Sequence, residues 1–311
     1  QKEMSQLKAK SDIPVLYKQN VANDLFQLIY VFDMGNNHDK ALGTAFDYLE
    51  YLGTSDMTPE ELKSEFYRLA CTFYVSPGNE RTYVVLSGLN ENMPAAVQLF
   101  EKLLADAQVN KEAYTNMTSD ILKARSDAKL NQGQNFSRLM SFAMYGPKSP
   151  ATNLLTEAEL TNMNPQELVD RIHNQNSYKH RILYYGPSSS KDLLATINQY
   201  HQVPAALKDI PAGNEYSYLE TPVTKVLVAP YDAKQIYMAQ ISNLDKKYDP
   251  AIEPIRALYD EYFGGGMNSI VFQEMRETRG LAYSAWASIA ELLEVSLCTT
   301  YTDCHAKRQN D

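Results

Sequence analysis

Cysteine, tryptophan and long apolar runs are what this sequence of 311 residues has least of. Its three cysteines, Cys71, Cys298 and Cys304, are too few for a disulfide framework and leave at least one thiol unpaired. No run approaches the about 18 consecutive apolar residues that a membrane-spanning helix needs. No basic stretch followed by an apolar one opens the chain. A small disulfide-stapled module and insertion into a membrane are therefore excluded.

Basic residues are also in deficit. The chain has 29 lysines and arginines against 38 aspartates and glutamates, which gives a net charge of −9. An acidic protein is repelled on average by phosphates, so we expect no nucleic-acid partner. With 44% hydrophobic and 22% charged residues, the composition is that of a folded chain long enough for two domains. Tyrosine is abundant, with 22 residues, and its amphipathic ring favours contacts with other chains.

The first part of the chain predicts alternating strands and helices. Residues 1–11 are polar and predict a linker. The apolar run 25–32 predicts a strand, and apolar spacing over 39–52 predicts a helix. Further strand or helix patterns follow at 71–75, 82–86, 93–107, 111–130, 136–145, 181–185 and 189–199. Prolines and a glycine then mark residues 201–221 as a linker.

The segment after residue 221 repeats the order of the first part. A second unit begins at residues 225–229, and a strand pattern at 235–241 leads into a helical pattern over 252–263. The two helix ends match, since residues 50–53 and 261–264 both place a Glu-Tyr pair before an apolar residue and a glycine. An internal repeat of this length predicts a duplicated domain.

The segment 264–284 is the most informative in the chain. Three glycines form a turn, Ile270, Val271 and Met275 share one helical face, and Gly280 is placed to end the helix before a strand. The glycines alone require only that two elements meet at a tight corner. The whole string, in its order after the preceding helices and linker, resembles the late segment of the pitrilysin/insulinase family of zinc metallopeptidases, also called inverzincins.

This resemblance implies an α+β fold of tandem metallopeptidase-type α/β roll domains, each a mixed sheet packed against helices. In the family, two homologous halves of two such domains close around an unfolded peptide. We expect a linker over 1–11, a first roll domain over 12–200, an interdomain linker over 201–221 and a second roll domain over 222–311. Only 28 residues follow Tyr283 (311 − 283), so the second domain is expected to be incomplete.

The metal motif of the family is degenerate here. Family members hold zinc with a His-x-x-Glu-His motif on the first long helix and a later Glu as third ligand. The matching positions are Asp47, Glu50 and Tyr51, and the third-ligand position falls near Lys123. The resemblance therefore implies no metal and no cofactor in this chain, with zinc in the catalytic half of the parent protein. Glu50, without a metal, is expected to be solvated or ion-paired.

The five histidines show no ligand spacing with one another. Cys298, Cys304 and His305 come close together, yet no fourth ligand or closed loop accompanies them. Surface or core positions are therefore expected for these three residues.

The resemblance does imply function for two residues. In the family, an arginine late on the helix after the Gly-rich turn and a tyrosine on the next strand reach the peptide held at the other half's zinc. The matching positions are Arg276 and Tyr283, whose side chains can donate hydrogen bonds to a peptide carbonyl or oxyanion. The alternatives are a helix-terminal ion pair of Arg276 with Glu274 or Glu277, and a half-buried strand position for Tyr283.

The resemblance thus implies the non-catalytic C-terminal half of a pitrilysin/insulinase-like zinc metalloendopeptidase, a hydrolase active in proteolysis. The chain alone is expected to be inactive, with the catalytic half, in the same polypeptide or a partner subunit, and unfolded peptides as its partners. The alternative is a peptide-binding or scaffold protein related to the non-catalytic processing-peptidase and core subunits. The start at Gln1 and the few cysteines suit a periplasmic location, while cytosolic and organellar locations are equally compatible.

Overall fold

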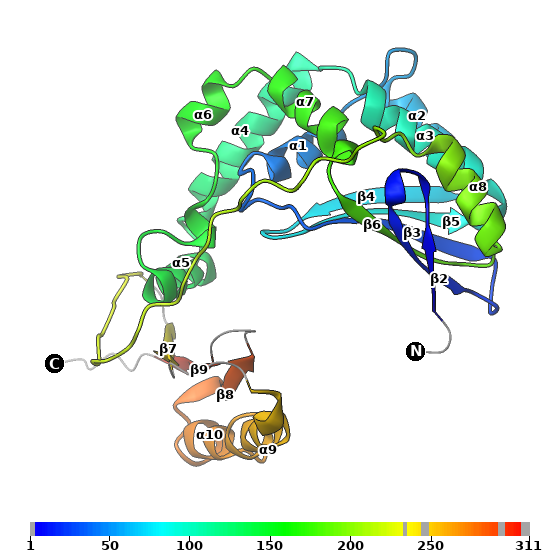
Figure 1. Ribbon diagram of the computed structural model, residues 1–311. Helices are drawn as coiled ribbons and strands as arrows, with labels where there is room; N and C mark the ends of the chain where they lie inside the picture. The colour runs from blue at the N-terminus through cyan, green and yellow to red at the C-terminus, as the bar shows by residue number, and fades with distance from the viewer. Residues whose placement is uncertain (1–3, 233–234, 244–248, 292–295, 306–311) are drawn as a thin grey trace. The chain divides into compact units, whose positions relative to one another are not determined.

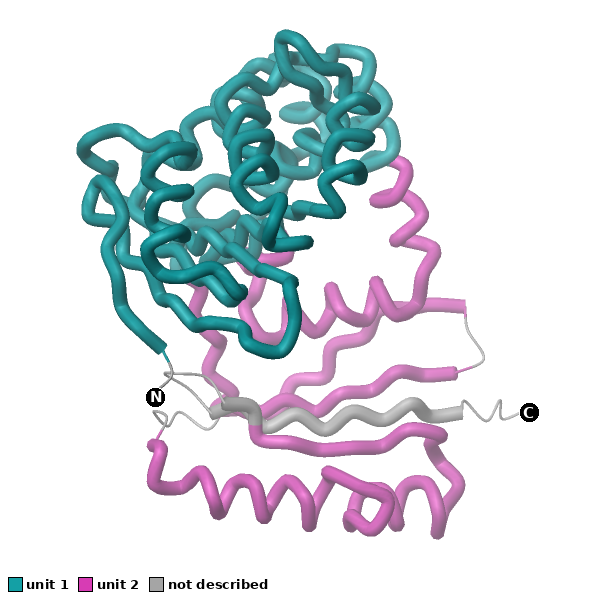
Figure 2. Tube along the Cα trace, turned by 90° about the vertical axis from the view of Figure 1, so that its right-hand side faces the viewer, with its two compact units in different colours: residues 1–122, 153–215 teal, residues 123–152, 216–311 magenta. Residues whose placement is uncertain are grey.

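The computed structural model describes residues 4–232, 235–243, 249–291 and 296–305. Two compact units make up the chain (Figure 2): residues 1–122 with 153–215, and residues 123–152 with 216–311. Both contain helices and a sheet, so the predicted α+β class is confirmed. No helix in the described ranges is both long and apolar enough to cross a membrane.

A six-stranded mixed sheet forms the base of the first unit, in the order β1-β2-β6-β3-β5-β4. Its strands are β1 (Ser5–Lys8), β2 (Pro14–Gln19), β3 (Leu25–Phe32), β4 (Cys71–Pro77), β5 (Thr82–Leu89) and β6 (His180–Gly186). β2 and β6 are parallel, and the other neighbours are antiparallel. β1 lies within residues 1–11, where a linker was expected. It forms a strand because its backbone pairs with β2. The sequence pattern did not predict β2.

Helices cover one face of this sheet, as Figure 1 shows for α1, α2, α3, α7 and α8. The helices that begin in this unit are α1 (Leu42–Leu49), α2 (Pro59–Arg68), α3 (Met93–Asp106), α4 (Lys111–Ala128), α6 (Glu157–Asn162), α7 (Gln166–Asn174) and α8 (Ser190–Tyr200). Their apolar stripes meet the inward strand residues in one core cluster, where Phe32, Tyr48 and Phe100 are almost fully buried. The helices expected over 93–107, 111–130 and 189–199 are confirmed.

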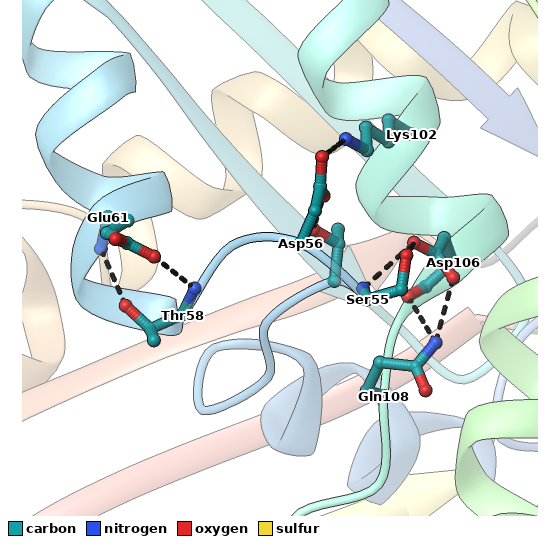
Figure 3. A network of polar contacts seen from close by, with 8 residues as sticks. Ser55, Asp56, Thr58, Glu61, Lys102, Asp106 and Gln108 are labelled. Carbon is teal, nitrogen blue, oxygen red and sulfur yellow. Dashed lines mark hydrogen bonds and ion pairs between the residues drawn. The ribbon is translucent and has the colours of Figure 1, made fainter.

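The loop between α1 and α2 is held by polar side chains (Figure 3). Thr58 caps α2 by accepting a hydrogen bond from Glu61 N at 3.2 Å, and Glu61 Oε2 accepts one from Thr58 N at 2.8 Å. This reciprocal arrangement is a capping box, which satisfies two backbone donors at the start of the helix. Ser55 donates to Asp106 Oδ2 from its backbone N–H and its hydroxyl, at 2.9 and 2.6 Å. The loop is therefore tied to α3 as well as to α2.

A chain of buried polar side chains runs through the core of this unit. His201 Nδ1, just after α8, lies 2.6 Å from Glu101 Oε1 on α3, and His201 Nε2 lies 2.9 Å from His180 Nε2 on β6. His180 Nδ1 lies 2.7 Å from Tyr178 O. A carbonyl oxygen only accepts, so His180 Nδ1 carries a hydrogen and Nε2 of neutral His180 accepts from His201. The exposed fractions of Glu101 and His201 are 1% and 0%.

The second unit is built on a three-stranded antiparallel sheet in the order β7-β9-β8. Its strands are β7 (Gln235–Asn243), β8 (Ala282–Glu291) and β9 (Ser296–His305). Its helices are α5 (Gln132–Tyr145), α9 (Glu253–Phe263) and α10 (Ile270–Phe272), which continues as a π-helix over Gln273–Thr278. α9 and α10 pack on β8, and α5 packs against β7. The strand expected at 235–241 and the helices expected at 136–145 and 252–263 are confirmed.

Residues 225–229, where the second unit is expected to begin, have no regular secondary structure. Val226 and Val228 expose 83% and 76% of their surface. Within the described part of the chain no strand pairs with this segment. Strand propensity largely reflects packing against neighbouring strands and burial, so an unpaired apolar run does not form a strand by itself.

We expect the chain to lose stability as the pH falls from about 6.5 toward 4. Burial, and then the neighbouring His201, lower the pKa of His180 to about 4. The unfolded state, whose histidine pKa is about 6.5, therefore binds the proton first, and unfolding becomes more favourable on acidification. The free energy of unfolding, measured with urea, should fall by about 2 kcal/mol between pH 7 and pH 5.

A His180→Asn variant is the control for this pH dependence. Asparagine does not titrate, so the variant should lose most of the change while its stability at pH 7 is already lower. Carboxylates with lowered pKa values, such as Glu159 at about 2, act below this pH window. The same slope in the wild-type protein and in the variant would contradict the assignment to His180.

Candidate functional site

The helix that corresponds to the zinc helix of the family is α1. Its buried face is anchored by Tyr48, whose hydroxyl donates to Asn110 O at 2.6 Å and accepts from Asn110 N at 2.9 Å. The three motif positions lie on exposed positions instead. Asp47 is in the last turn, Glu50 is the C-cap residue, and Tyr51 lies beyond the end of the helix with 47% of its surface exposed.

The electrostatics of this helix end do not favour a zinc site. Although Asp47 is exposed, the surrounding protein keeps part of the water from its carboxyl, and this desolvation, together with the negative charge of Glu50, raises its pKa. Two carboxylates beside a neutral phenol lack the imidazole ligands of the family motif. Among the side chains that the structure describes, no group of three or more His, Cys, Asp or Glu could hold a metal ion.

The remaining metal candidates from the sequence are placed as follows. Lys123, near the expected third-ligand position, is an exposed residue of α4. The side chains of Cys298, Cys304 and His305 lie outside the described part of the structure, although their backbone belongs to β9. The remaining cysteine, Cys71, is a buried free thiol.

A second candidate site lies in the second unit, where a short helix meets β8. Ser269 caps α10 by accepting a hydrogen bond from Phe272 N at 3.3 Å. Gly280 follows the π-helix with a φ of 59°, the left-handed conformation that favours glycine at a helix end, as the sequence predicts. The register of β8 with β9 then shifts between Ala282 and Ser284. Tyr283 is therefore the extra residue of a β-bulge, a feature that re-aims side chains.

Arg276 and Tyr283 are brought together at this site. Arg276 Cζ lies 5.1 Å from the centroid of the Tyr283 ring and 4.8 Å from that of Phe272. The guanidinium thus contacts two aromatic rings, which orient it by cation–π attraction. Tyr283 exposes 69% of its surface and the Arg276 side chain 39%. Such a pair can donate several hydrogen bonds to a carbonyl or carboxylate that reaches it.

The structure agrees with the alternative of an ion pair for Arg276 but not with that of a half-buried position for Tyr283. Arg276 does form an ion pair, with Glu277 Oε1 at 3.6 Å from its Nε. Tyr283 is exposed rather than half-buried. Phe272 is the participant that the sequence reasoning missed. The signal was present, because residues four apart on a helix are neighbours and Phe272 precedes Arg276 by four.

Comparisons with known proteins were made for the whole chain, and no family model matches it. An uncharacterized zinc protease of Rickettsia felis is 20% identical over 280 residues, which cover 86% of this chain and 64% of the relative. An uncharacterized zinc protease of Streptomyces coelicolor is 22% identical over 290 residues, or 87% and 61% of the two chains. The chain therefore spans less than two thirds of the length of these relatives.

Solved structures share the fold over nearly the whole chain. The periplasmic protease PqqL from Escherichia coli has a TM-score of 0.82 at 14% identity, covering 100% of this chain and 35% of that chain. The inactive domain of a peptidase M16 from Pseudomonas fluorescens has a TM-score of 0.74 at 17% identity, covering 97% and 74%.

The chain shares its α+β fold with these peptidase structures, and the α1 positions matched to the zinc motif carry Asp47 and Tyr51 in place of its two histidines. Its sequence relatives are zinc proteases. The predicted resemblance to the pitrilysin/insulinase family, in its non-catalytic half, is thereby confirmed.

We expect the purified chain to retain little zinc, because Asp47, Glu50 and Tyr51 do not supply the ligands of a tight site. After zinc loading and dialysis, metal analysis should find about a tenth of a zinc per chain or less, and added zinc should not raise the melting temperature. An Asp47→His, Tyr51→His double variant is the control, since its imidazoles provide ligands at both lost positions and should increase retention. One tightly held zinc per wild-type chain would contradict this expectation.

Proposed function

We propose that this chain is the non-catalytic half of a zinc metalloendopeptidase, which encloses peptide substrate and contributes Arg276 and Tyr283 to a zinc site on the other half. The observation that carries the proposal is the contact between these two residues at the bulge of β8. Two rings support the guanidinium of Arg276, whose side chain remains 39% exposed although its Nε also pairs with Glu277.

The chemistry of the pair suits the hydrolysis of a peptide bond. A guanidinium and a phenol both donate hydrogen bonds, and such donors stabilise the negative charge that develops on the carbonyl oxygen when water attacks. Because stacking restrains Arg276, little side-chain freedom is lost when it binds a peptide. The zinc and the residue that activates water belong to the catalytic half, in the same polypeptide or in a partner subunit.

The proposal has further parts, some of which the comparisons support. The zinc proteases among the relatives support a hydrolase as the parent protein. The two roll domains of this half are residues 12–200 and 222–311, and unfolded peptides are the substrates. The similarity in fold to a periplasmic protease supports a periplasmic location.

Substitution of the two residues tests the proposed function. In the protein combined with its catalytic half, Arg276→Ala and Tyr283→Phe should each lower kcat/KM for a peptide about tenfold, because each removes a hydrogen bond to the reacting carbonyl. The measurement is the hydrolysis of a fluorogenic peptide at substrate concentrations far below KM.

Arg279→Ala is the matched control for these variants. Arg279 is exposed and pairs with Glu274 at 3.2 Å, without contact to either ring that supports Arg276. Its loss should leave kcat/KM unchanged. Unchanged hydrolysis by both site variants would remove the functional assignment and favour a peptide-binding or scaffold role.

A further inference from the structure

The six-stranded sheet has a second face that no helix of the first unit covers within the described residues (Figure 1). The buried apolar residues of the helices join only the strand residues that point toward them. Val31 and Val85 point the other way, since both are buried but neither belongs to that core cluster. We call this side the open face, and its central row consists of Leu16, Leu183, Ile29, Val85 and Tyr74.

Strand register aligns one apolar residue from each of five neighbouring strands in the central row. Leu16 pairs with Leu183 and Leu183 with Ile29, and the row continues through Val85 to Tyr74. At about 4.8 Å between strands, the row is about 19 Å long, which is the length of about six extended residues. Leu16, Ile29 and Leu183 are partly exposed and Tyr74 exposes 52% of its surface, whereas Val85 is buried with 2% exposed.

Tyrosines and basic residues border the central row. Tyr83 and Tyr185, on the rows to either side, expose 38% and 44% of their surface. The charged residues that the strands place on this face are Lys8, Lys18 and Arg181, of which Lys8 pairs with Asp12 and Arg181 with Asp33. The whole protein, by contrast, has a net charge of −9. This face is therefore complementary to an acidic partner.

One end of the open face has a local excess of positive charge. Asp33 accepts a hydrogen bond from Arg81 Nε at 2.9 Å and another from Arg181 Nη1 at 2.6 Å. The hydrogen bond from Arg181 is the main cause that lowers the pKa of Asp33, so this carboxylate is charged at neutral pH. Two guanidiniums against one carboxylate leave one positive charge. Arg81 exposes 56% of its side chain, so a second carboxylate can reach it.

We propose that the open face binds an extended acidic segment of peptide, with apolar side chains on the central row and a carboxylate at Arg81. The inference rests on the proposed function and deepens it by naming the substrate class, which is peptides that alternate leucine-like or aromatic residues with Asp or Glu. Tyrosines suit this task because they offer large, rigid contacts with a polar end. A second copy of this chain that docked through its own open face fits less well, because its basic residues would lie against those of the first copy.

Direct binding to the full chain tests the inference. The probes are two fluorescent peptides that resist cleavage, one alternating Leu with Glu and the other alternating Leu with Lys. Fluorescence anisotropy should show at least about tenfold tighter binding of the Leu-Glu peptide at low salt, and the preference should shrink as salt screens the charges.

Two exposed residues of the open face are changed in turn. Tyr74→Ser and Arg81→Gln should each weaken binding of the Leu-Glu peptide about fivefold, through a lost apolar contact and a lost charge. The matched controls are Tyr262→Ser on α9 and Arg68→Gln on α2, where Arg68 pairs with Glu65 at the surface. Both controls should bind like the wild-type protein.

Two results would overturn the inference. One is equal binding of both peptides, or equal losses in the site and control variants. The other is a wild-type dimer that Tyr74→Ser dissociates in sedimentation experiments, because the face would then be an interface between copies. Failure here is distinct from failure of the proposed function, since hydrolysis that depends on Arg276 would stand without peptide binding at the open face.

Discussion

A single carboxylate on α3 connects the elements that enclose the core of the first unit. Besides His201 at Oε1, Glu101 accepts hydrogen bonds at Oε2 from Asn176 Nδ2 at 3.0 Å and from Gln202 N at 2.9 Å. A buried charge that lacks partners costs several kcal/mol, so removing one of these partners leaves the carboxylate of Glu101 with less compensation for its burial. The hydrogen bonds to Glu101 therefore hold together α3, the end of α8 and the turn before β6.

The hydrogen bonds of Glu101 and the two histidines lie on one face of the sheet only. His180 continues the chain of polar contacts onto β6, and its ring centroid lies 4.6 Å from that of Phe32 on β3. All of these contacts form on the helix-covered side, where the core lies. The residues between them on each strand face the other way and do not contribute to this core. Packing of the core therefore does not determine which residues occupy these positions, and they can serve binding instead.

The sequence predicted the parts of the fold whose cause is local. The apolar residues of α3 recur at helical spacing over 93–107, and the structure has the expected helix over Met93–Asp106. The contacts between distant residues had no such signal. His180 and His201 show no ligand spacing in the sequence, yet the fold brings His180 to His201 and His201 to Glu101, which lies 100 residues before His201. Only packing of the helices over the sheet creates that arrangement.

The second candidate site shows the same division. Residue types and spacing indicated Arg276 and Tyr283, but their contact depends on a π-helix over Gln273–Thr278 and on a bulge in β8. Both are irregularities of backbone hydrogen bonding, and neither follows from the spacing of apolar residues. The sequence therefore indicated Arg276 and Tyr283, while Phe272 and the position of the guanidinium between two rings had to come from the structure.

The buried and exposed sides of α1 contribute differently to the fold. On α1 the buried residues Leu42, Phe46 and Tyr48 pack in the core. The Tyr48 hydroxyl both donates a hydrogen bond to the backbone of Asn110 and accepts one from it. Asp47 and Tyr51 stand on exposed positions, where a substitution changes few packing contacts. Metal ligands can thus be lost from the outer side of this helix while its inner side keeps the fold.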